Sequence, residues 1–304
     1  MKRERVPAPA ASPRRRRPAR LRFLGTELED IAPEAARFHV LPVPYEKTVS
    51  YGGGTAKGPA AILAASGQLE RWDGRSDPGA QGIYTWPAID CRPKAENVIA
   101  AIAASVARIL ALEKMPVVLG GEHTVTGGVI RGYLDAGVRD FGVVQIDAHA
   151  DLRDRYGGNP LSHASVMRRV VEAGIPLFQL GNRAYSQEER EARARYNVRY
   201  LDADQLVPAR IDSITLPDDF PAQVFFTLDV DGIDPSVLPA TGTPVPGGLG
   251  WYQTLGLFES VARQRRIIGF DLLEFAPIRG FHAFDFAAAA LVYKLMGIVQ
   301  RAAG

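Results

Sequence analysis

Short apolar runs rich in β-branched and aromatic residues alternate along the chain with longer stretches in which apolar residues recur every three or four positions. The short runs predict β-strands over residues 38–43, 117–119, 141–146, 177–180, 224–228 and 267–272. The longer stretches predict helices over residues 59–65, 96–113, 162–173, 252–263 and 285–300. Strands that alternate with helices are typical of an α/β fold, in which helices cover a parallel sheet.

Residues 23–304 are predicted to form a single α/β domain, because no internal repeat and no interior linker divides them. The stretch from Pro235 to Gly250 is rich in Pro, Gly and Thr, which predicts an ordered loop near the strand ends or a mobile lid. No apolar run reaches the roughly 18–20 residues that a membrane span needs, so we expect no membrane span. The single cysteine, Cys91, excludes an internal disulfide and fits the cytoplasm, which we take as the expected compartment.

The net charge of +2 hides a strongly basic N-terminal segment. Residues 1–22 contain nine Lys and Arg against one Glu, together with four prolines, so the rest of the chain is acidic. A segment with so little apolar content is predicted to be a disordered, solvated arm. Two alternatives remain for the arm: a contact with nucleic acid or an acidic partner, and a role as a transit peptide. A secretory signal peptide is not expected, because the arm lacks the apolar core that one needs.

Polar clusters directly follow four of the predicted strands. They are GGEH up to residue 123, DAHAD at 147–151, DVDGIDP at 229–235, and the glutamate at 274. In open α/β sheets the carboxyl ends of the strands line the ligand crevice, so these clusters are expected to converge at one site.

The spacing of the acidic and histidine residues in these clusters favours a metal centre. In extended chain, alternate residues point the same way, which aligns Asp147, His149 and Asp151, and likewise Asp229 and Asp231. Four carboxylates crowded into one crevice would repel each other strongly, and divalent cations would relieve that repulsion.

With His123, this set supplies four carboxylates and two imidazoles, enough for two divalent ions if some carboxylates bridge. Two other candidates, Asp140 and His282, stand apart from these clusters and are interpreted as ordinary polar residues. The predicted chemistry is therefore that of a hydrolase with two metal ions.

Five motifs resemble in content and order those of the ureohydrolases, the arginase and agmatinase family. In chain order they are PVPYEKTVSYGGGTAKGPAAILAAS, GGEHTVT, QIDAHADLRD, SHASVMRR and LDVDGIDPSVLPATGTPVPGGL. The resemblance covers roughly residues 38–300, and the agmatinase branch looks closest. It implies a three-layer α/β/α fold around a mainly parallel sheet of about eight strands. Glu122 and Thr124 depart from the family pattern, which more often has Asp and Ser there, and neither is expected to ligate a metal.

The resemblance also implies a ligand set and a mechanism. One ion would be held by His123, Asp147, Asp151 and Asp229, and the other by Asp147, His149, Asp229 and Asp231. The family usually uses Mn²⁺, although this set of oxygen and imidazole ligands would also accept Zn²⁺, Co²⁺ or Ni²⁺. A hydroxide that bridges the ions would attack the guanidinium carbon.

Two further residues acquire roles through the resemblance. His163 would carry a proton to the leaving amine, whereas without the resemblance it reads as a surface histidine at a helix start. Glu274 would bind the guanidinium nitrogens of the substrate, whereas its alternation with the apolar Leu273 and Phe275 would also fit an exposed glutamate.

The expected reaction is hydrolysis of agmatine to putrescine and urea. N1-aminopropylagmatine, guanidinobutyrate, guanidinopropionate and arginine remain alternative substrates. A metal-dependent amide hydrolase or deacetylase with a single Zn²⁺, and a metal-binding protein without activity, are the alternatives from other classes. The resemblance suggests a homo-oligomer, a trimer or hexamer, and apart from the arm we expect no nucleic-acid partner.

Overall fold

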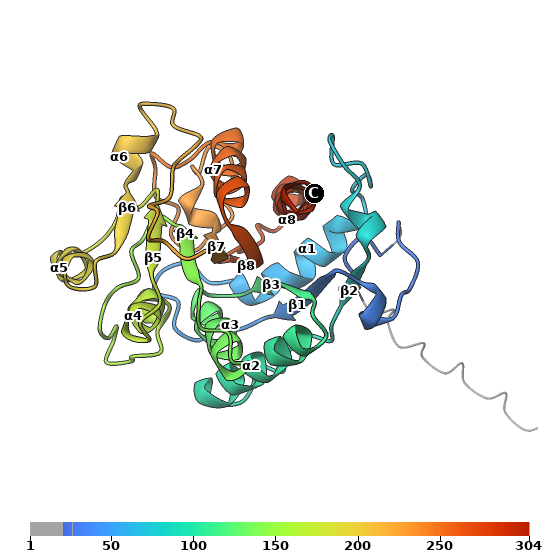
Figure 1. The fold of residues 1–304 in the computed structure, drawn as a ribbon, viewed down its shortest axis with the longest axis horizontal. Helices are drawn as coiled ribbons and strands as arrows, with labels where there is room; N and C mark the ends of the chain where they lie inside the picture. Colours follow the sequence, from blue (N-terminus) through green and yellow to red (C-terminus); the bar gives the residue numbers. More distant parts are fainter. Residues whose placement is uncertain (1–20, 26, 304) are drawn as a thin grey trace, which may run out of the picture.

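The computed structural model describes residues 21–25 and 27–303, so most of the predicted N-terminal arm lies outside the described residues. Eight parallel strands form one central sheet (Figure 1). They are β1 (Phe38–Val43), β2 (Ile83–Thr85), β3 (Met115–Gly120), β4 (Gly142–Ile146), β5 (Leu177–Leu180), β6 (Arg199–Leu201), β7 (Gln223–Asp229) and β8 (Arg266–Leu273). Their order in the sheet is β2-β1-β3-β8-β7-β4-β5-β6. The six predicted strands are confirmed, and the edge strands β2 and β6 are additional.

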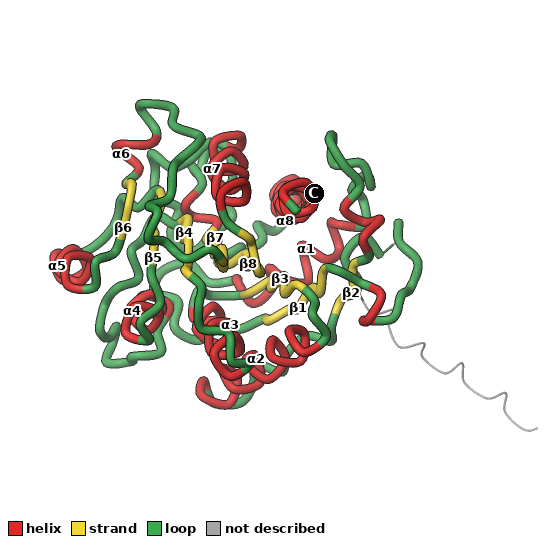
Figure 2. The backbone as a smooth tube through the Cα atoms, in the orientation of Figure 1, coloured by secondary structure: helices red, strands yellow, loops and turns green. Residues whose placement is uncertain are grey.

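Helices cover both faces of the sheet, which confirms the three-layer α/β/α prediction (Figure 2). The helices are α1 (Gly58–Ser66), α2 (Ala95–Ala111), α3 (Thr124–Asp135), α4 (Val166–Glu172), α5 (Gln187–Arg195), α6 (Ala203–Leu206), α7 (Trp251–Gln264) and α8 (His282–Ala302). Helices α2, α3 and α4 pack together on one face, whereas α1, α7 and α8 pack together on the other (Figure 1). The helix predicted over 162–173 begins as a 3₁₀ turn, His163–Ser165, before α4.

The two faces of the sheet bury separate hydrophobic clusters because successive side chains of a strand point in opposite directions. In β7, Phe226 packs against Phe258 of α7 with ring centroids 4.6 Å apart. Its neighbour Phe225 packs on the other face against Tyr133 of α3, at 5.6 Å. Full burial of one such side chain stabilises the fold by about 1.5–3 kcal/mol. The continuous apolar pattern of β7 thus specifies a strand covered on both sides.

Helix α8 is long and apolar enough to cross a membrane by length and composition. Over half of its apolar window, 56%, is buried inside the molecule, and the helix packs against α1 and α7. Its polar side chains also make contacts within the fold, since Tyr293 donates to the carbonyl of Arg71 and Arg301 pairs with Asp73. Helix α8 therefore has the environment of a core helix.

The loops at the carboxyl edge of the sheet approach each other closely where glycine permits it. Gly121, directly after β3, donates its N–H to the carbonyl of Val43 and accepts from the N–H of Glu274. A Cβ atom at Gly121 would lie 2.0 Å from the carbonyl oxygen of Tyr45, so no larger residue fits there. This close approach places the residues that follow β3 beside those that follow β8.

Candidate metal centre

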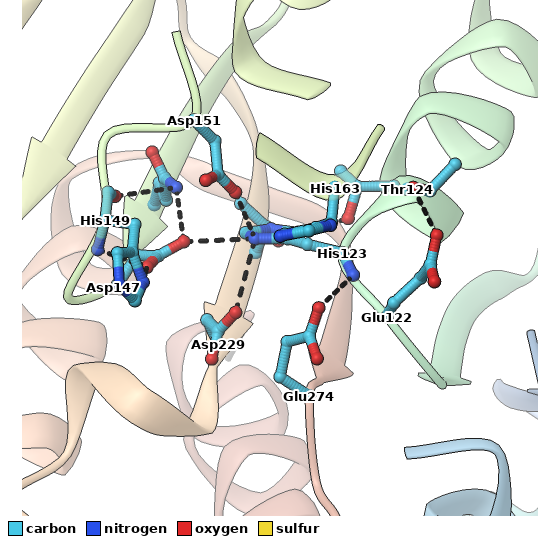
Figure 3. A network of polar contacts seen from close by, with 12 residues as sticks. Glu122, His123, Thr124, Asp147, His149, Asp151, His163, Asp229 and Glu274 are labelled. Carbon is cyan, nitrogen blue, oxygen red and sulfur yellow. Dashed lines mark hydrogen bonds and ion pairs between the residues drawn. The ribbon is translucent and has the colours of Figure 1, made fainter. Parts of the chain in front are cut away.

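The polar clusters that follow β3, β4, β7 and β8 meet at the carboxyl edge of the sheet, as predicted (Figure 3). His123 is central among them. Its Nδ1 atom lies 3.0 Å from Asp147 Oδ2, 2.9 Å from Asp151 Oδ2 and 3.4 Å from Asp229 Oδ2. This nitrogen is buried and has no hydrogen-bond partner among the described residues. A buried imidazole nitrogen that faces three carboxylate oxygens is the donor set of a divalent cation site.

A second group of ligand atoms lies beside the first. The Nδ1 atom of His149 is 3.0 Å from Asp231 Oδ2 and 3.6 Å from Asp147 Oδ1. Asp147 therefore turns one oxygen toward each histidine, as a bridging carboxylate would. Asp229 lies beside the first group through its contact with His123, and its Oδ1 accepts the N–H of Asp231. The structure brings together all six predicted ligand residues.

The electrostatics of the two groups are those of crowded, buried acids. Burial and the negative charge of Asp147 raise the pKa of Asp151 to about 7. Burial and the charges of Asp231 and Asp147 raise the pKa of Asp229 well above its ordinary value. Burial opposes protonation of His149, but the charges of Asp231 and Asp147 and the hydrogen bonds to them together outweigh it and raise the pKa of His149 to about 12. Cations held among these carboxylates would offset the same repulsion, so the residues present fit a dinuclear metal site.

A buried chain of side chains fixes the orientation of the shared carboxylate. Gln145 Nε2 donates to Asp147 Oδ2 at 2.7 Å, and Gln179 Nε2 donates to Gln145 Oε1 at 2.7 Å. Gln179 in turn accepts from Arg193 Nε at 2.9 Å, and the Arg193 guanidinium pairs with Asp202. These four residues were not predicted. A glutamine inside an otherwise apolar strand is the sequence feature that could have indicated Gln145 and Gln179.

Two predicted site residues have backbone conformations that ordinary residues seldom adopt. Asp151 has φ 51° and Glu274 has φ 59°, both in the left-handed region. A residue other than glycine costs of order 1–3 kcal/mol in such a conformation, and sites of function are where proteins tolerate that cost. In both cases the turn directs a carboxylate into the site at a strand end.

Glu274 is buried, which removes the alternative of an ordinary exposed glutamate. Only 8% of its surface is exposed, and its Oε1 accepts the backbone N–H of His123 at 2.7 Å. Burial, together with the charge of Asp231, raises its pKa well above the ordinary value, against the hydrogen bond from His123. The strand alternation that suggested a surface position ends at Leu273, because the left-handed turn at residue 274 redirects the side chain.

His163 begins the 3₁₀ turn before α4 and lines the same hollow as the ligand groups. Its Nδ1 atom is 3.0 Å from Thr48 Oγ1, and its ring packs edge-on against Tyr156 with centroids 5.7 Å apart. Burial lowers the pKa of His163, while the charge of Glu122 opposes this shift. Asp140 and His282 lie outside both ligand groups and do not line the hollow.

The hollow has a volume of about 170 Å³ and opens between several loops. Its rim includes two aromatic residues that the sequence did not indicate, Tyr51 and Tyr156. Among the described residues, Arg153 is the only Lys or Arg that lines the hollow. Its Nε atom lies 3.7 Å from Glu189 Oε2. The loop over 235–250 is held by Arg183, which donates to the carbonyls of Val245 and Pro246, so it has the character of an ordered loop.

Comparison with known proteins assigns this arrangement to a family. The family model "Arginase family" matches residues 36–297. The chain is 40% identical to N(1)-aminopropylagmatine ureohydrolase of Synechocystis sp., over 85% of this chain and 87% of that protein. It is 34% identical to the protein of the same name in Thermus thermophilus, over 91% and 94%. It is 28% identical to the agmatinase of Pyrococcus horikoshii, over 92% and 98%.

Solved structures show the same fold. The agmatine ureohydrolase of Thermoplasma volcanium superposes with a TM-score of 0.80 at 28% identity, over 93% of this chain and 95% of that one. An arginase from Medicago truncatula superposes with a TM-score of 0.78 at 26% identity, over 87% and 88%.

Proposed function

Because the chain belongs to the arginase family of ureohydrolases, we propose that it hydrolyses a guanidino amine of the agmatine type to urea and the corresponding amine. Agmatine, which would yield putrescine, is the first candidate. The observation that carries the proposal is the pair of His/Asp groups that share Asp147. The buried Glu274 lies in the same hollow.

We assign two divalent cations to this site, with Mn²⁺ as the proposed metal. The proposed ligands are His123, Asp147, Asp151 and Asp229 for one ion, and Asp147, His149, Asp229 and Asp231 for the other. When bound, the ions would supply a water deprotonated near neutral pH and positive charge beside the reacting carbon. The protein holds the carboxylates in place for this, through the donors to Asp147 and the strained turn at Asp151.

Glu274 is proposed to bind the substrate guanidinium. The guanidinium group is planar and presents N–H donors in pairs, which a carboxylate accepts with two oxygens. One oxygen of Glu274 is held by the N–H of His123, so the carboxylate has a fixed direction beside the ligand groups.

His163 is proposed to move the proton that the reaction requires. The oxygen of water bonds to the guanidinium carbon, the bond from that carbon to the alkyl nitrogen breaks, and this nitrogen must gain a proton to leave as an amine. His163 lines the hollow, and burial lowers the pKa of its ring, which favours the neutral form that can accept a proton. Such a ring can take and return a proton near neutral pH.

The hollow favours a substrate with a cationic tail. The exposed ring of Tyr51 stands at its rim and can receive an ammonium group over its face, whereas the ring of Tyr156 already lies beneath the guanidinium of Arg153. An acidic tail would need a free cation, whereas the charge of Arg153 is compensated by Glu189. N1-aminopropylagmatine is the second candidate, because two of the relatives carry that substrate in their names.

The deciding experiment is urea release with Mn²⁺-loaded protein. The panel contains agmatine, N1-aminopropylagmatine, arginine, guanidinobutyrate and guanidinopropionate, with Asp229→Asn as the inactive control. We expect turnover of agmatine or N1-aminopropylagmatine that the control abolishes. No urea from any of the five by protein with two bound ions would overturn the proposal and favour amide substrates.

Assembly and compartment remain predictions. We propose a trimer or hexamer in the cytoplasm, by analogy with the family. Light scattering coupled to size-exclusion chromatography measures the mass of the particle, and a monomeric mass would contradict the first part.

A further inference from the structure

Glu122 is a fully buried carboxylate with no part in the proposed chemistry, although it directly precedes a metal ligand. Its Oε2 accepts the backbone N–H groups of Lys47 and Thr48, at 2.5 and 2.6 Å. Its Oε1 accepts the hydroxyls of Thr48 and Thr124, at 2.7 and 2.8 Å. Four donors surround this group, as an ionised carboxylate, which can only accept, requires. Glu122 also occupies the position where the family pattern more often has aspartate.

Thr48 connects this carboxylate to His163. The Thr48 hydroxyl oxygen accepts the backbone N–H of His163 at 3.0 Å and lies 3.0 Å from His163 Nδ1. Another hydroxyl near that nitrogen, Ser162 Oγ, is more distant at 3.4 Å. Glu122, Thr48 and His163 thus form a continuous line of short polar contacts from the buried carboxylate to the imidazole.

The direction of the hydrogen bonds in this line follows from counting protons. A threonine hydroxyl has one proton, and the contact with Glu122 uses it, because the carboxylate has none to give. Thr48 Oγ1 therefore offers only lone pairs to His163. The proton of a neutral His163 ring must then lie on Nδ1, which leaves Nε2 as the nitrogen that can accept a proton.

We propose that Glu122 and Thr48 are positioning residues that hold the imidazole of His163 in the Nδ1–H tautomer, an inference that rests on the proposed role of His163. The relay selects which nitrogen exchanges the proton with the leaving amine. It does so through hydrogen bonds that none of the proposed metal ligands makes. Glutamate at position 122 provides the reach to both Thr48 and the backbone of residues 47 and 48.

A purely structural role for Glu122, as an anchor of the loop around Thr48, predicts different behaviour in a Thr48→Val variant. Valine matches the shape of threonine, and the backbone N–H groups of residues 47 and 48 would still donate to Glu122. The anchor would persist, whereas the relay would lose the hydroxyl that joins Glu122 to His163. Thr48→Ser restores the hydroxyl, and Thr124→Val removes a different hydroxyl from the same carboxylate oxygen.

The tautomer can be measured directly by ¹⁵N NMR of histidine-labelled, Zn²⁺-loaded protein, which is diamagnetic. The chain has five histidines, and a His163→Asn variant assigns the signal that disappears. We expect the Nδ1–H pattern in the parent protein and in Thr48→Ser and Thr124→Val. Thr48→Val should show the Nε2–H tautomer or a mixture. The Nε2–H pattern in the parent, or an unchanged pattern in Thr48→Val, would overturn the proposal, whatever the substrate.

Steady-state kinetics supply the second readout. Thr48→Val should lower kcat by about 10- to 100-fold with KM within about twofold, because general acid-base catalysis contributes about 10²–10⁴-fold and only part of it is lost. Thr48→Ser should recover kcat to within about threefold. An equal loss of kcat in Thr48→Val and Thr124→Val, or a change in KM alone, would contradict a positioning role. A parent protein that releases no urea would refute the proposed function, and the tautomer measurement would remain decisive for the relay.

Discussion

Asp147 is the residue on which the two ligand groups depend, because its two carboxylate oxygens each face a different histidine. Removing that charge should therefore affect both ions, whereas removing Asp231 should affect one. We expect the Asp147→Asn variant to retain fewer than about one ion per chain, and the Asp231→Asn variant to retain about one. Elemental analysis after gel filtration measures this, with Asp140→Asn as the control. Two ions retained in Asp147→Asn would exclude a bridging role.

Gln145 should tune metal binding without contacting a metal. Its amide holds one oxygen of Asp147, and partners of ligating carboxylates commonly contribute 10- to 100-fold to metal affinity. We expect Gln145→Met, which keeps the length of the side chain, to weaken Mn²⁺ binding by about 10-fold or more in a competition assay. Gln223→Met, at the half-buried first position of β7, is the control. Equal affinities in the two variants would show that the buried chain is only structural.

The proposed ligands could be predicted from the sequence because each is an aspartate or histidine at the end of an apolar strand or a few residues beyond it, and strand ends converge in a parallel sheet. Thr48, Glu122 and Gln145 could not be assigned roles in this way. Thr48 and Glu122 are 74 positions apart, and no local pattern indicates that they touch. The burial of Glu274 depends on one left-handed turn, which ended the alternation that the sequence suggested.

On the scale of elements, helix α8 is joined to the loop after α1 at a glycine. A Cβ at Gly297 would lie 1.7 Å from Asp73 Oδ2, so Gly297→Ala should displace this carboxylate. We expect a loss of about 1–3 kcal/mol from overpacking, partly offset by about 1 kcal/mol from better helix propensity. In contrast, Gly127→Ala in α3 meets Val166 at an ordinary 3.6 Å and should be neutral or stabilising. Chemical denaturation measures both, and similar effects would refute the steric argument.

The carboxylate of Asp73 should make the packing of α8 against the loop after α1 depend on pH. Burial would raise the pKa of Asp73, but hydrogen bonds from Arg301 and from the backbone of residues 75 and 76 outweigh it and lower the pKa. Ionised Asp73 therefore stabilises the folded protein above its unfolded-state pKa of about 4. This stabilisation is lost as the pH falls toward the lower pKa that Asp73 has in the folded protein. Asp73→Asn should cost about 1–3 kcal/mol at pH 7 and progressively less below about pH 4.

Thermal unfolding at several pH values tests this dependence. Asp219→Asn, in an exposed pair with Arg199, is the matched control and should have little effect at any pH. A deficit in Asp73→Asn that stays constant down to pH 3 would show that the ion pair does not contribute through its charge.

Most core elements could be predicted because their apolar patterns are long or doubly covered. The edge strands β2 and β6 have only three residues each, too few to show a period. Helix α3 contains two adjacent glycines and several β-branched residues, which hide a helical pattern that tertiary packing against α2 stabilises. Helix α5 is polar on nearly all sides, and only its Ser186/Glu189 capping box marks it.

At the scale of the whole molecule, the ligand groups join segments that follow three different strands. Metal ions that bind only the folded chain should therefore stabilise all of it, by about 4 kcal/mol when present at a thousand times their Kd. Removal of metal with a chelator should lower the Tm by several degrees, and added Mn²⁺ should restore it. The Asp147→Asn variant should show no such shift. A Tm that is the same with and without metal would indicate that the site forms no part of the stability of the fold.

The position of β8 has a consequence for how the protein is made. Of the eight strands that the structure describes, it comes last in the chain, yet it lies at the centre of the sheet, between β3 and β7. Until residues 266–273 leave the ribosome, the strands on either side have no partner to join them across that gap. Loop closure over such long separations in sequence slows folding. We therefore expect the nascent chain to complete its sheet, and with it any capacity to bind metal, only after β8 has left the ribosome.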